Sequence, residues 1–127
     1  MVFNKRTAQL QSIDEKVHDV VLSSGLPYQS KVKFPGPYDE PVDVDYRVKN
    51  PTKHASILVL KGHHAQAIEV YRKWEDLKKA SVSDRFLTIY DDIKGVDRQG
   101  DLKRLKDISD VVPISQPERI DELLKAA

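Results

Sequence analysis

The amino-acid sequence predicts a single α/β domain with a mixed sheet of about five strands flanked by helices, in the order α-β-β-β-α-β-α-β-α. Three observations support this prediction. Residues 42–48 (VDVDYRV) alternate between apolar and polar, residues 55–61 (ASILVLK) are apolar on both faces, and residues 64–79 carry a helix-spaced apolar stripe. A chain of 127 residues forms one domain and buries roughly two-thirds of its unfolded surface.

The first element is an amphipathic helix over residues 6–24, where apolar residues recur at three- and four-residue spacing. Asn4 or Thr7 is placed to cap its start, and Gly25 stands where a left-handed residue commonly ends a helix. Pro27 prevents the helix from continuing.

An antiparallel hairpin follows, formed by residues 28–34 and 42–48. The connecting segment PGPYDEP is rich in turn-forming residues. Strict alternation in the second strand predicts one apolar face and one polar face, made respectively by Val42, Val44, Tyr46 and Val48 and by Asp43, Asp45 and Arg47.

The hairpin and a βαβ unit together form a core over residues 28–90. The apolar strand at 55–61, the helix at 64–79 and a strand at 85–90 predict parallel strands with a right-handed crossover. Trp74 lies on the apolar stripe of the helix and is the predicted main anchor of the core.

The remaining residues, 101–127, predict an α-β-α extension. It contains a short helix at 101–108, an edge strand at 111–114 and a final helix. Ser115 and Glu118 have the spacing of a capping box at the start of that last helix.

Composition excludes several classes of function. The chain has no cysteine, so disulfides, thiol catalysis and cysteine metal sites are excluded. Its net charge of +1 does not require binding to nucleic acid or to anionic membranes. The N-terminus has no apolar secretory segment, and the longest apolar run, residues 57–60, cannot cross a bilayer. We therefore expect a cytoplasmic protein that does not enter membranes.

One group of residues has a pattern suited to catalysis. Asp43 and Asp45 lie on one strand, and Lys61 ends the next. Two carboxylates beside a lysine can hold Mg²⁺ and orient a water for phosphodiester cleavage. Strict alternation also explains the aspartates as the solvated face of a half-exposed strand. Both interpretations remain open at this point.

The order α-β-β-β-α-β, with acids on the second strand and a lysine ending the third, resembles the core of the PD-(D/E)xK nuclease superfamily, which has a restriction-endonuclease-like fold. The resemblance covers residues 6–90. It implies that Asp43 or Asp45 is the first metal-binding acid and that Lys61 orients the attacking water.

The sequence departs from this pattern at Val59, which stands where the family has its second acid. An apolar side chain there lowers the expected affinity for the cation. Cleavage would then need a ligand from another position, such as Glu69 or the neutral Gln66 on the following helix.

A second resemblance covers the hairpin, the Trp74 helix, the RFLTIYDD strand and the VVPIS segment. These are similar to the C-terminal part of uncharacterised proteins of phages and other mobile elements. This resemblance implies an accessory protein of a mobile element and adds no site.

Histidines and basic residues supply two further candidate binding regions. His63 and His64 are adjacent, so on a helix they point about 100° apart and cannot readily share one metal ion. We predict no metal site there, and expect the two histidines to polarise the first turn of the helix or to contact solvent. Lys103 and Arg104 belong to a basic cluster over residues 94–106, which is diluted by Asp97, Asp101 and Asp107.

From these observations we expect a non-catalytic binding domain that requires no cofactor. Its partner would be a protein, self-association included. One alternative is a Mg²⁺-dependent nuclease with a displaced acidic ligand. Another is a nucleic-acid-binding module that uses Lys61 and the 94–106 cluster.

Overall fold

The computed structural model describes residues 12–126 and confirms an α/β domain with a five-stranded mixed sheet. The elements, in chain order, are α2 (Ile13–Ser23), β1 (Tyr28–Phe34), β2 (Val42–Val48), β3 (Ala55–Leu60), α3 (His64–Lys79), β4 (Arg85–Tyr90), α4 (Gln99–Lys106), β5 (Asp110–Pro113) and α5 (Pro117–Lys125). None of these helices is long and apolar enough to span a bilayer.

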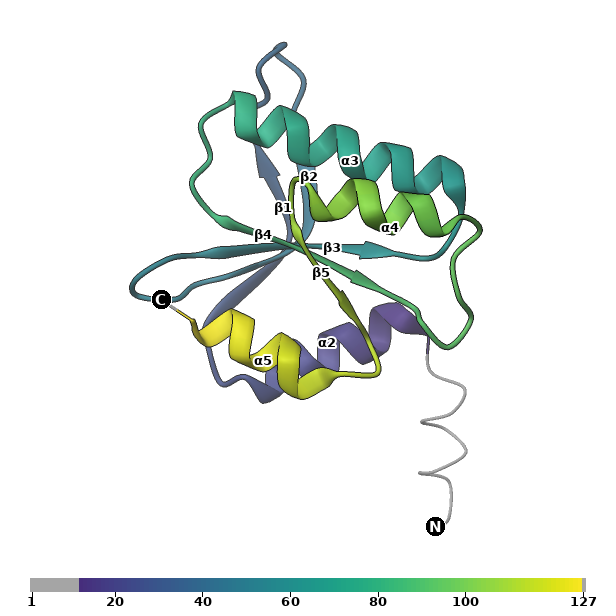
Figure 1. The fold of residues 1–127 in the computed structure, drawn as a ribbon. Coiled ribbons are helices and arrows are strands. Elements are labelled where there is room, and N and C mark those ends of the chain that lie inside the picture. Colours follow the sequence, from purple (N-terminus) through teal and green to yellow (C-terminus); the bar gives the residue numbers. More distant parts are fainter. Residues whose placement is uncertain (1–11, 127) are drawn as a thin grey trace.

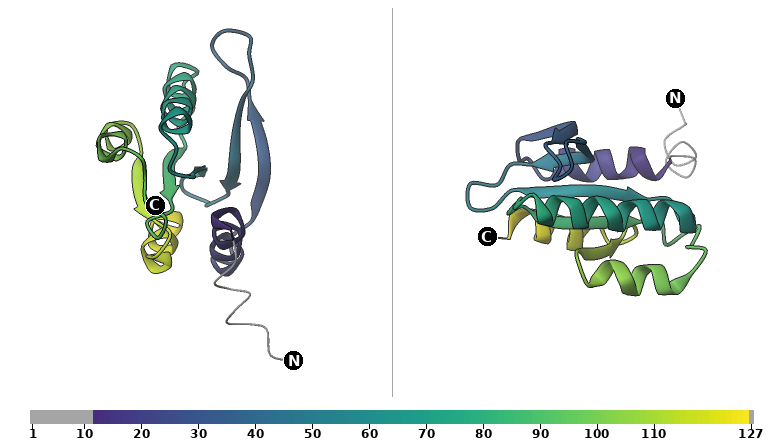
Figure 2. Two further views of the ribbon diagram at one scale, coloured as in Figure 1. Left: turned by 90° about the vertical axis from the view of Figure 1, so that its right-hand side faces the viewer. Right: turned by 90° about the horizontal axis from the view of Figure 1, so that it is seen from above.

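The strands lie side by side in sequence order, β1-β2-β3-β4-β5. β1, β2 and β3 are antiparallel neighbours, whereas β3, β4 and β5 are parallel, as the hairpin and βαβ predictions require. Helices α3 and α4 cover one face of the sheet, and α2 and α5 cover the other (Figures 1 and 2). The predicted edge strand near Pro113 is β5, at the opposite edge from β1.

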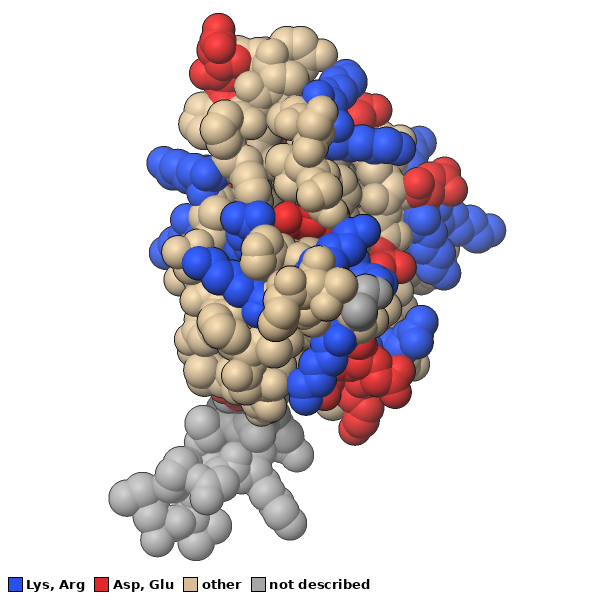
Figure 3. All heavy atoms as spheres, turned by 90° about the vertical axis from the view of Figure 1, so that its left-hand side faces the viewer, with Lys and Arg blue, Asp and Glu red and all other residues tan. Residues whose placement is uncertain are grey.

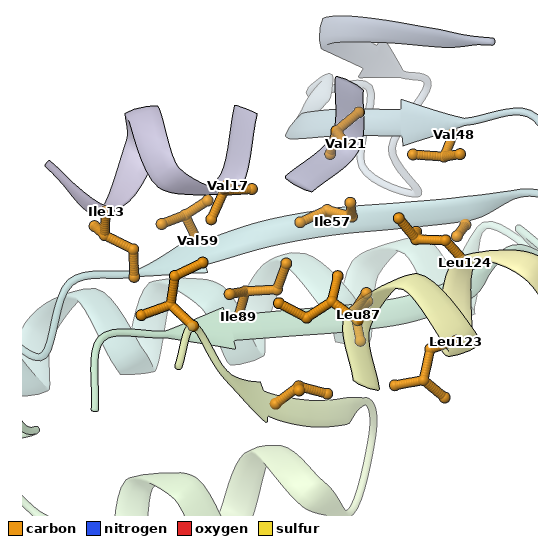
Figure 4. Close-up of a cluster of buried hydrophobic side chains, with 14 residues drawn as sticks. Ile13, Val17, Val21, Val48, Ile57, Val59, Leu87, Ile89, Leu123 and Leu124 are labelled. Atoms are coloured by element: carbon orange, nitrogen blue, oxygen red, sulfur yellow. The ribbon is translucent and has the colours of Figure 1, made fainter. Parts of the chain in front are cut away.

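Each face of β3 packs into a separate hydrophobic core, because all six of its residues are buried. Ile57 and Val59 face the core beneath α2 and α5, which Figure 4 shows in close-up. Leu58 and Leu60 face the core beneath α3 and α4. This arrangement confirms the prediction of a central strand covered on both sides.

Trp74 anchors the core on the α3 side, as predicted. Its side chain is fully buried and stacks on Phe86 with ring centroids 4.6 Å apart. The indole N–H donates to Thr88 Oγ1 at 2.8 Å, and Thr88 also hydrogen-bonds the Ser109 hydroxyl. The largest apolar side chain on α3 is therefore tied to β4 by a satisfied polar contact.

The prediction that β2 has a single apolar face is wrong. Val42 and Val44 pack into the core on the α3 side, whereas Val48 packs beneath α2 and α5. In β1, Lys31 has a φ of 51° and is absent from the regular pairing with β2. The hairpin therefore bends at its middle. Its half near the 35–41 turn packs on the α3 side of the sheet, and its other half packs on the side of α2 and α5.

The structure tests one of the two predicted helix starts. Helix α2 begins after Ser12, whose hydroxyl accepts from the Glu15 N–H, whereas Asn4 and Thr7 lie outside the described residues. The capping box at Ser115 is wrong, because its N–H and hydroxyl both bond to Asp92 instead. Helix α5 starts on Pro117 with no side-chain cap.

The Trp74–Thr88 contact leads to a stability prediction. Replacing Thr88 by Val keeps the side-chain volume but leaves the buried indole N–H without its acceptor. We expect the free energy of unfolding, measured by urea denaturation, to fall by about 1–3 kcal/mol. Thr52→Val, at an exposed position, is the matched control and should change it by less than about 0.5 kcal/mol. Equal effects of the two substitutions would contradict this account.

Candidate functional site

Asp45 lies where β2 separates from β3. The two strands pair only from Tyr46 to Val48 on β2, so the Val59 N–H has no backbone partner on β2. The Asp45 carboxylate takes that place and accepts from the Val59 N–H at 2.7 Å. Sequence alternation had placed Asp45 on a solvated face, whereas the structure leaves it only partly exposed.

Burial raises the pKa of Asp45 above its ordinary value of 3.8. The hydrogen bond from Val59 and the nearby ammonium groups of Lys73 and Lys61 oppose this shift, and the Asp14 carboxylate adds to it. The ionised form of Asp45 therefore costs free energy in the folded protein. Such a carboxylate is held by the fold, with at most one oxygen free for another partner.

Lys61 pairs with Asp14 of α2, with Nζ and Oδ2 2.9 Å apart. This hydrogen bond and the charge of Asp14 raise the pKa of Lys61, with a smaller contribution from Asp45. Both side chains are about half exposed, so the ion pair adds little stability. Asp14 was not predicted as a site residue, because an acid in the first turn of a helix is common and does not by itself indicate a site.

Val59 lies on β3 near both Asp45 and Lys61, but its side chain packs in an apolar environment. Its side chain is 3% exposed and lies beneath α2, beside Ile13 and Val17 (Figure 4). Gln66 of α3 bridges the backbone on either side, donating from Nε2 to the Val59 carbonyl at 3.0 Å and accepting from the Lys61 N–H at 2.6 Å. The end of β3 is therefore held by side-chain amide and carboxylate groups.

Two other residues considered as metal ligands lie apart from this group. Asp43 is exposed on the outer half of the hairpin, opposite Lys33. Glu69 is exposed on α3, where it pairs with Arg72. The structure thus brings Asp45 and Lys61 near each other and adds Asp14.

The described residues do not fit a Mg²⁺ ion. Between Ser12 and Ala126, no group of three or more His, Asp or Glu side chains could hold a metal. One Asp45 oxygen accepts from the backbone, Asp14 pairs with Lys61, and Val59 offers no ligand. We therefore derive no step through a bound cation.

His64 joins α3 to the loop and helix that follow β4. Its N–H donates to Asp97 Oδ2 at 3.2 Å, and its Nδ1 lies 2.9 Å from Asp101 Oδ1. Arg98 donates to His64 Nε2 at 3.2 Å, which makes Nε2 an acceptor and places the ring proton on Nδ1. His64 is therefore engaged within the protein, whereas His63 is exposed.

A cavity of about 450 Å³ opens at the carboxyl ends of β3 and β4, next to Lys61. Open α/β sheets commonly bind ligands at this edge. Gly62 and Gly95 both line it, and a Cβ at Gly62 would stand 2.6 Å from the Gly95 carbonyl oxygen. The lining residues are Ser12, Ile13, Asp14, Lys61, Gly62, His63, Asp91, Lys94, Gly95 and Asp97.

One of the three acids in the predicted basic cluster is buried in the structure. Lys103 and Arg104 are exposed on α4, where neither forms an ion pair with another described residue. Asp97 and Asp101, expected to offset them, are turned towards His64, and Asp101 is buried. Asp97 and Asp107 stay exposed, so burial removes only Asp101 from the surface of this cluster.

Comparisons with known proteins show the fold alone. No protein-family model matches the sequence, and no curated protein matches it. The solved structure "Protein of Unknown Function AF1548" aligns with a TM-score of 0.61 and 12% identity, over 84% of this chain and 59% of that one. Protein VC1899 from Vibrio cholerae aligns with a TM-score of 0.60 and 11% identity, over 88% of this chain and 32% of that one. The chain thus spans less than two thirds of either protein.

The partly buried Asp45 carboxylate leads to a prediction with a defined pH dependence. Asp45→Asn keeps an acceptor for the Val59 N–H and removes the charge, so we expect a free energy of unfolding equal to or above wild type at pH 7. Because the folded pKa of Asp45 is raised, any advantage of the Asp45→Asn variant should shrink as the pH falls through that value towards 3.8.

Asp45→Ala is the companion variant, since it removes the acceptor as well as the charge. We expect it to lose about 1–3 kcal/mol at pH 7 in the same urea titration. If the Asn and Ala substitutions destabilise the protein equally, the hydrogen bond to Val59 is not what Asp45 contributes.

Proposed function

We propose that this chain is a non-catalytic binding domain built on a nuclease-like core. The observation that carries the proposal is the environment of Val59. In the resemblance to the PD-(D/E)xK superfamily this position holds a metal-binding acid, but here it is a 3% exposed valine packed beneath α2. A carboxylate at that position would have to be buried among apolar side chains at a large cost in free energy.

The roles of the neighbouring polar residues support the same proposal. Asp45 accepts from the Val59 N–H, Gln66 spans two backbone groups of β3, and Lys61 pairs with Asp14. For catalysis, the oxygens of the acid and the amine of the lysine must be free to face a substrate. Here Asp45 and Gln66 bond the backbone at the end of β3, and the Lys61 amine is engaged with Asp14.

Under this proposal the partner is a protein, with a second copy of the chain as one version of it, and the protein acts in the cytoplasm. An origin in a phage or another mobile element belongs to the proposal too. It rests on the resemblance of the hairpin, the Trp74 helix and the VVPIS segment to such proteins. The competing functions are the nuclease and the nucleic-acid-binding module, and each has its own assay.

A plasmid-nicking assay distinguishes the binding domain from the nuclease. Wild-type protein, Asp45→Asn and Lys61→Ala are incubated with supercoiled plasmid and Mg²⁺ or Mn²⁺, and relaxed product is measured over time. We expect the three proteins to give the same background. Metal-dependent nicking by wild type that both substitutions abolish would overturn the proposal. Nicking that survives in both variants would come from a contaminating enzyme.

A further inference from the structure

Strand β1 is a free edge of the sheet. In the order β1-β2-β3-β4-β5 its inner side pairs with β2, and no strand within residues 12–126 lies on its outer side. Alternate residues of such a strand direct their N–H and C=O groups outwards, where an extended segment of another protein can pair with them.

Basic side chains gather around this edge. Residues 28–34 and 46–54 contain five lysines and arginines and no acid. Arg47 pairs with Asp84, but Lys31, Lys33, Lys49 and Lys53 are exposed and form no ion pair with a described residue. The Lys49 N–H donates to the Pro27 carbonyl at 2.7 Å, which places Lys49 beside the start of β1.

Figure 3 shows the side of the molecule on which the β2–β3 connection lies in Figure 1. Lysine and arginine side chains spread across the middle of this face, with few acidic groups among them. The compensating acids lie elsewhere, since α2 and α5 together carry six acidic and three basic residues. The net charge of +1 is therefore unevenly distributed, with basic residues on this face and acidic residues on α2 and α5.

We propose that the first half of β1, from Tyr28 to Ser30, adds a short acidic strand from a partner protein. Lys49 and Lys31 lie at the two ends of this half and would face acidic side chains of the partner. This inference rests on the proposed binding function and names the chemistry of its partner.

The bend at Lys31 sets the length of the docking segment. Its positive φ interrupts the regular pairing between β1 and β2, so the free edge is divided at that residue. A shallow hollow of about 570 Å³ lies along the same stretch, lined by Tyr28, Gln29, Ser30, Lys31 and Val32. A side chain of the docked strand would rest in this hollow while its backbone pairs with β1.

Charge and geometry favour this occupant over two others. In an antiparallel pairing of β1 with a second copy, lysines of the two chains would approach each other and repel. A nucleic acid would meet the lysines but cannot use the outward N–H and C=O groups of a strand. An acidic extended peptide can pair with the outward N–H and C=O groups of β1 and can also face the lysines.

The test is fluorescence anisotropy with a labelled short peptide of alternating glutamate and valine. The full chain is titrated into this peptide, into its N-methylated form, which cannot pair as a strand, and into a labelled oligonucleotide. We expect binding of the acidic peptide alone. The double variant Lys31→Glu with Lys49→Glu should weaken binding about tenfold or more.

Lys78→Glu with Lys79→Glu is the matched control, because it makes the same change of charge on exposed residues of α3, outside every candidate binding region. It should change the affinity by less than about twofold. Lys31→Gln with Lys49→Gln removes the same two charges without reversing them. It should also weaken binding of the acidic peptide, but less than the charge-reversed variant does. This milder variant shows that a loss of binding does not come from a folding defect of the charge-reversed protein.

Several outcomes would overturn the inference. These are no binding of the acidic peptide, equal binding of the N-methylated peptide, equal losses in the two charge-reversed variants, or lysine-dependent binding of the oligonucleotide alone. A wild-type dimer that dissociates in the Lys31→Glu, Lys49→Glu protein would assign the edge to a second copy. None of these outcomes bears on plasmid nicking, so the inference and the non-catalytic proposal fail independently.

Discussion

The hydrogen bond from the Val59 N–H to the Asp45 carboxylate is the interaction on which the arrangement of this domain depends. It lies where β2 stops pairing with β3 and satisfies a backbone group in the middle of a strand that is buried on both faces. Without an acceptor, that N–H would cost about 1–3 kcal/mol. Because the contact is made by a side chain, the hairpin can bend away and place Val42 and Val44 over the core beneath α3.

Under the proposed non-catalytic function, the same constraint gives other roles to the residues that match the PD-(D/E)xK pattern. The acid of β2 is used to support the bend, and the lysine at the end of β3 is used to hold the first turn of α2. Val59, between them, completes the apolar contact with that helix. Asp45 and Lys61 thus each have a partner within the fold, whereas Asp43 is exposed on the outer half of the hairpin. Basic side chains that pair with no described acid lie elsewhere, around the free edge of β1 and on α4.

Local patterns were sufficient to predict most of the fold. The bounds of α3 and β4 follow directly from apolar periodicity, and Trp74 could be recognised as the anchor because no other side chain on its helix is as large. The bend in the hairpin could not be predicted, since the alternation of β2 continues through it without a break. The roles of Asp14 and Ser115 also depend on contacts with distant segments, which spacing along the chain does not reveal.

The central proposal is that Asp45 holds the backbone of β3 and that neither Asp45 nor Lys61 binds a cation. Titrating Mn²⁺ into ¹⁵N-labelled protein tests it most directly, because a bound paramagnetic ion broadens the amide signals of nearby residues. The account predicts that substoichiometric Mn²⁺ leaves the signals of Asp45, Val59 and Lys61 no broader than those of the rest of the domain. Selective broadening at these three residues and at Asp14, abolished by Asp45→Asn, would contradict it.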